Sequence, residues 1–299
     1  MKIALALLAA AVAAASAPAL AVHTADGWRS WWRADRAPAR WAAADRTVAG
    51  QVRWRTAAPG VELGELRLSG AGEAWRVRVV LARLDPAKVR LRLVYDGDPL
   101  NRPNRWSVDD APAEALVALN AGQFDGRGPW GWVVQDGVER RPPGPGPLAP
   151  ALVVDSAGRA RIVPVDSLDE LRRGRGIETA FQSYPAVLLE DGVVPAPLRE
   201  AGRGVSITHR DARLAVGTTR DGRILVALTR FEGLGGVLSN LPFGLTTPEM
   251  AALMGALGAS RAMLLDGGLS SQLLVREADE THTWRGLRKV PAGLVAVAR

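Results

Sequence analysis

The amino-acid sequence predicts a single strand-rich α/β domain of the α+β type, with a mixed sheet and few helices. Residues 75–79 and 89–94 alternate apolar side chains with arginine, which is typical of strands with one buried face. Asp-Gly turns at 191–192 and 221–222 join pairs of apolar segments and predict hairpins. One segment, 246–258, has the start and stop signals of a helix.

Composition excludes several classes of site. The 299 residues are 47% hydrophobic, which is enough for a sizeable core. There is no cysteine, so disulfides, thiolate metal sites and a cysteine nucleophile are excluded. A three-histidine zinc site would need His23, His209 and His282 together. The net charge of +7 comes almost entirely from dispersed arginines without a recognition motif, so we expect no nucleic-acid partner.

The first residues predict a signal peptide over 1–21. Lys2 precedes an apolar run over 3–15, and Ala19-Leu20-Ala21 has the pattern of a cleavage site. The run is shorter than the roughly 20 residues of a membrane-spanning helix. Cleavage is expected after Ala21 or, as the second choice, after Ala17. The mature protein is therefore expected to be exported, to the periplasm or the extracellular space.

A Trp/Arg-rich extension over 22–58 precedes the main domain, which is assigned to 59–299. Trp28, Trp31 and Trp32 have helical spacing, which favours a short helix packed on the main domain. The alternative is a surface over 28–41 that contacts a glycan or a membrane interface, because tryptophan suits both.

The other elements follow in chain order. A short helix is expected to start at 109–115, and the apolar run 115–119 predicts a strand buried on both faces. The Pro/Gly segment 141–150 predicts a surface loop, after which 151–155 returns to a strand pattern. In the predicted helix 246–258, Thr246 and Glu249 form a capping box and Pro248 suits the first turn.

Two glycine-containing loops carry the candidate chemistry. Residues 120–125 and 266–271 each follow a buried strand and combine polar groups with glycine. Glycine lets the backbone approach a ligand and present its N–H groups to an anion such as phosphate. The simpler interpretation is that both are tight turns. Arg213 opens a hairpin strand, where an arginine is most often a solvated charge, and Tyr184 sits in a turn before another strand.

Taken in order, these segments resemble the phosphodiester glycosidase family over residues 60–298. The resemblance rests on an ordered set of motifs: Asn120-Ala-Gly-Gln-Phe-Asp125, Tyr184 to Gly192, Arg213 to Gly222, Gly244 to Met250, and Leu264 to Ser271. Four residues depart from the usual family pattern and are expected to alter substrate choice or activity: Ala121, Gln123, Leu214 and Leu269.

The resemblance implies a hydrolase that cleaves a sugar-1-phosphodiester, and the predicted signal peptide implies that it is exported. The expected substrate is small or polymeric, such as an envelope or extracellular polysaccharide. Four residues are implied as catalytic: Asp266, Arg213, Asn120 and Asp125. Six more are implied as substrate contacts: Gly122, Tyr184, Gly267, Gly268, Ser270 and Ser271. No cofactor is required, although a divalent cation such as calcium is compatible with Asp125 or Asp266.

Two other functions fit the sequence. A non-catalytic envelope protein could bind anionic polysaccharide through the arginine-rich sheet face and the Trp/Arg segment. An ordinary glycoside hydrolase could use Asp125 and Asp266 as its two carboxylates, and their separation would bear on that interpretation.

Overall fold

Antiparallel strands make up most of the protein. The computed structural model describes residues 19–95, 105–126, 128–174, 176–233, 239 and 241–299. Every strand pairing within these residues is antiparallel. The strand-rich prediction is confirmed, but the predicted mixed sheet is wrong. Parallel pairs need long crossovers, usually helical, whereas many neighbouring strands here are joined by short turns.

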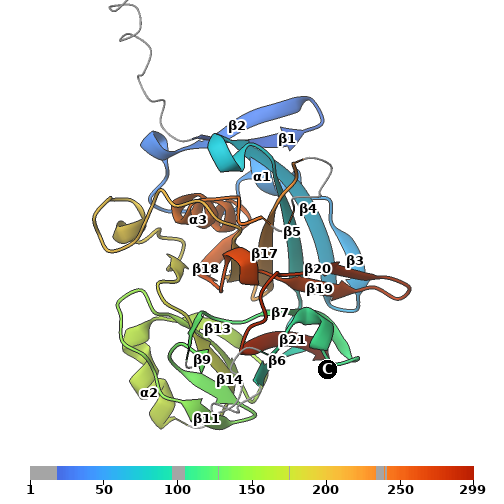
Figure 1. The fold of residues 1–299 in the computed structure, drawn as a ribbon, viewed down its shortest axis with the longest axis vertical. Helices are drawn as coiled ribbons and strands as arrows, with labels where there is room; N and C mark the ends of the chain where they lie inside the picture. The colour runs from blue at the N-terminus through green and yellow to red at the C-terminus, as the bar shows by residue number, and fades with distance from the viewer. Residues whose placement is uncertain (1–18, 96–104, 127, 175, 234–238, 240) are drawn as a thin grey trace, which may run out of the picture.

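The largest sheet has nine strands and occupies the upper part of Figure 1. Eight of them follow one another in the order β15 (Val187–Leu189), β18 (Ala259–Leu264), β16 (Leu214–Thr219), β17 (Ile224–Phe231), β5 (Val77–Leu84), β4 (Val61–Gly70), β1 (Ala19–Thr24) and β2 (Gly27–Arg33). The ninth, β3 (Arg55–Ala58), pairs with β4.

Two five-stranded sheets lie below it in Figure 1. One has the order β20 (Thr281–Trp284), β19 (Leu273–Arg276), β7 (Ala115–Asn120), β21 (Ala292–Ala298) and β6 (Val89–Tyr95). The other has the order β11 (Val138–Arg141), β10 (Val133–Gln135), β14 (Ile177–Gln182), β12 (Ala151–Asp155) and β13 (Ala160–Val163). A short pair completes the set: β8 (Phe124–Asp125) and β9 (Gly128–Pro129).

Helices are few and short among the described residues: α1 (Arg46–Ala49), α2 (Leu168–Arg173) and α3 (Thr247–Ala256). The predicted capping box of α3 is confirmed. The Thr246 hydroxyl accepts from the Glu249 N–H (3.3 Å), and the Glu249 carboxylate accepts from the Thr246 N–H (2.9 Å). Gly258 follows the helix with a φ of +95°, which suits glycine at such an end. No helix in the described residues is long and apolar enough to cross a membrane.

In the described part of the chain, short 3₁₀ turns account for the remaining helical residues: η1 (Ala34–Arg36), η2 (Gly72–Ala74), η3 (Val108–Asp110), η4 (Val165–Ser167), η5 (Ala196–Leu198) and η7 (Gly268–Ser270). The helix expected to start at 109–115 is therefore only the turn η3.

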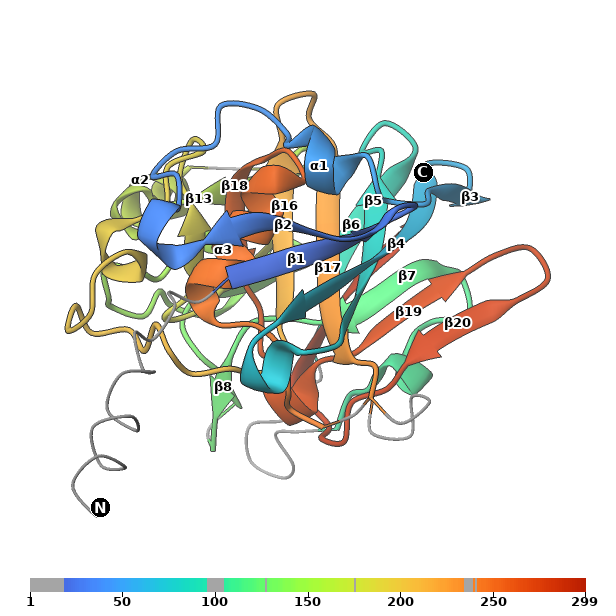
Figure 2. The ribbon, with the colours of Figure 1, turned by 90° about the horizontal axis from the view of Figure 1, so that it is seen from above.

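The Trp/Arg-rich segment is a strand, so the predicted short helix there is wrong. β2 pairs along its length with β1, and β1 also pairs with β4, as Figure 2 shows. Inter-strand pairing overrides a local spacing of three tryptophans. In this hairpin Trp32 is buried, whereas Trp28 is 50% exposed. Of the predicted signal peptide, residues 1–18 lie outside the described residues and 19–21 belong to β1.

Strand ends bring the two glycine loops together. β7 ends at Asn120 and β18 ends at Leu264, and the Asp266 N–H donates to the Ala121 carbonyl (3.2 Å). The loop before β16 joins them, because the Gly268 N–H donates to the Ala212 carbonyl (2.8 Å). These backbone hydrogen bonds bring the three loops into contact.

Candidate active site

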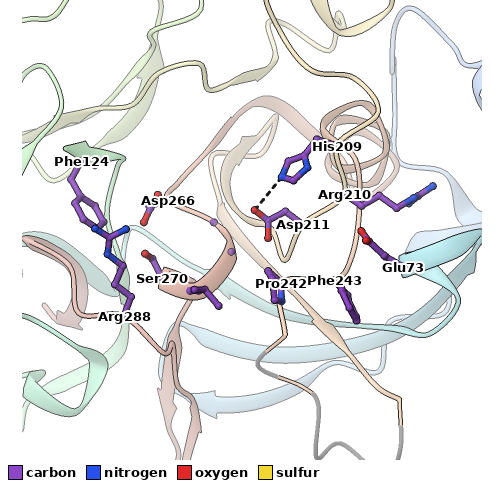
Figure 3. A pocket seen from close by; sticks show the side chains of 13 residues that line it. Glu73, Phe124, His209, Arg210, Asp211, Pro242, Phe243, Asp266, Ser270 and Arg288 are labelled. Atoms are coloured by element: carbon purple, nitrogen blue, oxygen red, sulfur yellow. Dashed lines mark ion pairs between the residues drawn. The ribbon is translucent and has the colours of Figure 1, made fainter. Parts of the chain in front are cut away.

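The loops enclose a cavity of about 490 Å³ (Figure 3). Its wall combines the loop before β16, the loop before α3, the loop after β18, the turn η2 and the start of β8. The lining residues are Glu73, Phe124, His209, Arg210, Asp211, Pro242, Phe243, Asp266, Gly267, Gly268, Leu269, Ser270 and Arg288. Among the predicted site residues, Asp266, Gly267, Gly268 and Ser270 line this cavity.

Asp266 is the predicted carboxylate that reaches the cavity. Burial raises its pKa to about 6, against an opposing hydrogen bond from Ser270 and the charge of Arg288. The nearby charge of Asp211 raises it further. A carboxyl group with a pKa near neutrality can both accept and release a proton under ordinary conditions, as acid–base catalysis requires.

Asp211 is a second carboxylate in the cavity, and sequence reasoning missed it. Two backbone hydrogen bonds with Leu245 (3.2 and 3.0 Å) hold it at the loop before α3. Burial raises its pKa, and its Oδ1 is buried with no hydrogen-bond partner in the described part of the chain. The other oxygen lies 3.8 Å from His209 Nε2. Figure 3 shows Asp266 on the side of Phe124 and Arg288, and Asp211 beside His209.

The glycine loop lies between the two carboxylates. Gly268 has a φ of +60°, and a Cβ there would lie 3.0 Å from the Asp211 carboxylate, so glycine permits that close approach. Most N–H groups of the predicted anion nest are used internally, since Ser270 donates to Gly267 and Ser271 to Gly268. Within the described residues, the N–H groups of Gly267 and Leu269 have no partner and remain available.

Arg288 is the second feature that the sequence analysis missed. Its guanidinium lies 4.8 Å above the Phe124 ring and lowers the pKa of Asp266 by its charge. It is exposed and lines the cavity, so it can form a bidentate pair with a phosphate there. Arg288 lies in a polar surface segment and belongs to no recognisable motif. The sequence therefore contains no pattern that could have identified it.

Arg210, which lines the cavity, forms an ion pair with the buried Glu249. Two short hydrogen bonds (2.6 and 2.8 Å) join them, and Glu249 is fully buried at the start of α3. Because Glu249 also caps α3, the pair fixes the loop that carries Asp211 to the end of the helix.

The sequence also matches a known protein family. The family model described as phosphodiester glycosidase matches residues 113–297. The chain belongs to the phosphodiester glycosidase family. No curated protein sequence matches it.

Two solved structures resemble this phosphodiester glycosidase family member. One is the zebrafish N-acetylglucosamine-1-phosphodiester alpha-N-acetylglucosaminidase catalytic domain, auto-inhibited by its pro-peptide. It is 18% identical, with a TM-score of 0.63, over 86% of this chain and 87% of that one. The other is a hypothetical protein from Synechocystis, 15% identical with a TM-score of 0.54, over 94% of this chain and 68% of that one. At these identities the likeness shows the fold alone.

Asn120 lies behind the cavity of this family member rather than in its lining. Its buried amide donates to the Asp266 carbonyl (2.8 Å) and accepts from the Gln272 N–H (2.9 Å). The side chain thus ties the end of β7 to both ends of the glycine loop. This arrangement positions Asp266.

Arg213 also lies outside the lining and supports the loop from below. Its guanidinium donates to the carbonyls of Leu245 (2.9 Å) and His209 (2.8 Å). Burial lowers its pKa, while the charges of Asp211 and Glu249 raise it. The structure therefore places this arginine as a support of the Asp211 loop, and Arg288 at the cavity.

The other predicted residues surround the cavity without lining it. Asp125 is exposed on β8, although its neighbour Phe124 lines the wall. A Cβ at Gly122 would lie 2.3 Å from the Gln182 carbonyl, so this glycine permits close chain packing. Tyr184 stacks on Trp130 with ring centroids 5.1 Å apart, and Ser271 is fully buried. Among the described residues, no group of three or more acidic or histidine side chains could hold a metal ion.

Proposed function

We propose that the protein is an exported hydrolase that cleaves the bond between the anomeric carbon of a sugar and a phosphodiester oxygen. Membership of the phosphodiester glycosidase family supports a hydrolase of this kind. The observation that carries the proposal is a single cavity lined by two carboxylates of raised pKa, Asp266 and Asp211, and by Arg288.

Departure of the leaving group needs little general-acid catalysis. The leaving group is a phosphate ester that carries its negative charge well, so charge stabilisation matters more than protonation. Arg288 and the N–H groups of Gly267 and Leu269 supply donors for the phosphate oxygens. Water adds to the anomeric carbon as the carbon–oxygen bond breaks, and the electron pair of that bond stays on the phosphate oxygen. The products are a free sugar and a phosphomonoester.

Asp266 is our candidate for the group that accepts the proton of the attacking water. Its pKa of about 6 leaves it mostly ionised at neutral pH and still basic enough to accept a proton. Asp211 then stabilises the positive charge that develops on the sugar ring, as expected for the oxocarbenium-like transition states of glycosidases.

Export and an envelope or extracellular polysaccharide substrate belong to the same proposal. The buried positions of Leu20 and Val22 in β1 favour a cut before that strand, as the second-choice cleavage site provides. A cut after Ala21 would divide β1, whereas a cut after Ala17 would leave it whole. Intact-mass measurement of the exported protein should therefore find a chain that still includes Ala19, and a mass beginning at Val22 would contradict this reasoning.

The proposed activity is tested with purified protein and a panel of sugar-1-phosphodiesters, N-acetylglucosamine-1-phosphate esters among them. Hydrolysis in heavy-oxygen water should put the label on the sugar, whereas a phosphodiesterase would put it on the phosphate. Asp266→Asn and Asp211→Asn should each lower kcat by about 100-fold or more. The exposed Asp125→Asn is the matched control. Release of no sugar from any member of the panel would refute the proposal.

A further inference from the structure

A second hollow, of about 570 Å³, is lined by two exposed tryptophans. Trp28 on β2 is 50% exposed and Trp75, at the end of η2, is 47% exposed. The other eight tryptophans, all in the described residues, are buried or half-buried. A large aromatic side chain left in water forgoes a substantial burial energy, and two in one hollow indicate a surface kept for a ligand.

Polar groups frame the two rings. Arg67 donates two hydrogen bonds to Glu232 (2.8 and 3.0 Å), and the Ser69 hydroxyl donates to the Trp75 carbonyl (2.8 Å). The Arg76 guanidinium lies 4.7 Å from the Trp75 ring centroid. The hollow therefore offers flat apolar faces beside ordered hydrogen-bonding groups.

This combination fits a saccharide better than a membrane. A sugar ring has an apolar C–H face for aromatic contact and hydroxyl groups at its edge for charged and polar partners, and the hollow has the size of ordinary ligand pockets. A membrane-inserting tryptophan would have to project from the surface. Both rings instead line a concavity that also contains the carboxylate of Glu232.

The charge of the hollow favours an anionic saccharide. Arg67 is neutralised by Glu232, whereas Arg76 forms no ion pair within the described part of the chain. One cation therefore remains for a negatively charged ligand such as a phosphate-bearing glycan.

The hollow adjoins the candidate active site. Glu73 on η2 lines the active-site cavity, and Trp75, two residues later, lines the hollow. The Trp75 ring contacts Phe231 edge-on (5.9 Å), and Phe231 contacts Phe243 in the same way (5.4 Å). Phe243 lines the active-site cavity and appears beside Glu73 in Figure 3.

We propose that this hollow binds a sugar unit of a phosphate-bearing saccharide chain, beyond the unit that is cleaved. The cleavage part rests on the proposed function, whereas saccharide binding at Trp28 and Trp75 does not. The substrate class that follows is an oligomer or polymer joined by phosphodiesters rather than a single sugar ester.

Binding is measured first, in the full mature protein with Asp266→Asn to prevent turnover. The probes are a phosphodiester-linked N-acetylglucosamine tetramer, a neutral N-acetylglucosamine tetramer and phosphatidylglycerol vesicles. Trp28→Ala and Trp75→Ala should each weaken binding of the phosphodiester tetramer about five- to tenfold, as expected for the loss of one aromatic contact. Phenylalanine at either position should restore most of it. Trp54→Ala is the control. The Arg83 guanidinium lies over the Trp54 ring, 4.4 Å from its centroid, just as Arg76 lies over Trp75, but Trp54 lies outside the hollow.

Turnover by the otherwise native protein gives a second readout. The same two variants should raise KM for the tetramer by a similar factor and leave KM for a single-sugar diester unchanged. Unchanged tetramer binding in the double alanine variant would overturn the inference, as would loss of vesicle binding alone. If no diester is hydrolysed but the tetramer still binds through both tryptophans, the proposed function fails and the saccharide site stands.

Discussion

Replacement of Asp266 by asparagine should stabilise the protein while it removes activity. Asparagine keeps the size of the side chain and an oxygen for the Ser270 hydrogen bond, but it cannot ionise. Burial makes the charged form of Asp266 costly, since the cavity replaces much of its water. The variant escapes that cost. Groups tuned for catalysis commonly reduce stability in this way.

The size and sign of the effect follow from the pKa. The rise from 3.8 to about 6 means that the folded protein binds this proton more tightly than the unfolded chain does. The contribution of Asp266 to stability is therefore fully present below pH 3.8 and is lost as the pH rises through about 6. At about 1.36 kcal/mol per pH unit, the loss amounts to about 3 kcal/mol at neutral pH.

Urea unfolding of the native protein and Asp266→Asn, followed by tryptophan fluorescence, measures this directly. The difference in unfolding free energy should be near zero at about pH 4 and should reach about 3 kcal/mol in favour of the variant by about pH 8. Asp279→Asn is the control, because this aspartate is exposed and lies outside the cavity lining. A difference that stays constant over this pH range would refute the reasoning.

Further variants test the other parts of the site. The rate of sugar release should fall with an acidic limb near pH 6, as Asp266 becomes protonated, and Asp266→Asn should lack that limb in whatever activity remains. Arg288→Ala should raise KM by about tenfold or more, because a charge-assisted hydrogen bond contributes about 1.5–3 kcal/mol, and Arg288→Lys should recover part of the loss in a steady-state assay. Gly268→Ala should lower the free energy of unfolding, measured by thermal denaturation, by about 1–3 kcal/mol. The backbone φ there is +60°, and the new Cβ would contact the carboxylate of Asp211. Glu249→Gln should cost about 3 kcal/mol in urea unfolding, because it leaves the Arg210 charge without its partner.

Each of these variants has a matched control in the same chain. Arg285→Ala removes an exposed arginine that pairs with Asp109 outside the cavity lining, and it should leave KM unchanged. Gly126→Ala adds a Cβ into open space and should change stability little. Glu65→Gln breaks a partly exposed ion pair with Arg78 and should cost less than about 1 kcal/mol. Equal losses in a variant and its control would contradict the role given to the site residue.

Local signals predicted local structure well. The α3 capping box needs only Thr246, Glu249 and the residues between them, and the hairpin turn at 221–222 needs only its own two residues. The tryptophans near residue 30 were misleading because β2 pairs with β1, and β1 in turn pairs with β4, which lies much later in the chain. A spacing of three and four residues carries no information about which strand lies beside it.

Residues of the site could be predicted only where they belong to a recognisable sequence motif. Asp266 stands in an ordered motif, whereas Asp211 becomes part of the cavity through contacts with Leu245 and Gly268 that no local pattern reveals. Arg213 shows the opposite case, because its motif is recognisable but the side chain supports two carbonyl groups of the backbone. Recognition of a motif therefore identifies a residue that matters, without telling whether it meets the ligand.

β5 pairs with both β17 and β4, so strands that precede residue 113 belong to the same sheet as strands that follow it. The family match begins at residue 113, so a fragment cut at that boundary would lack β5 and also β6, the partner of β21. It would expose two bare strand edges, each a template for pairing with another chain. A fragment that begins at the family boundary should therefore aggregate more readily than one that begins before Ala19.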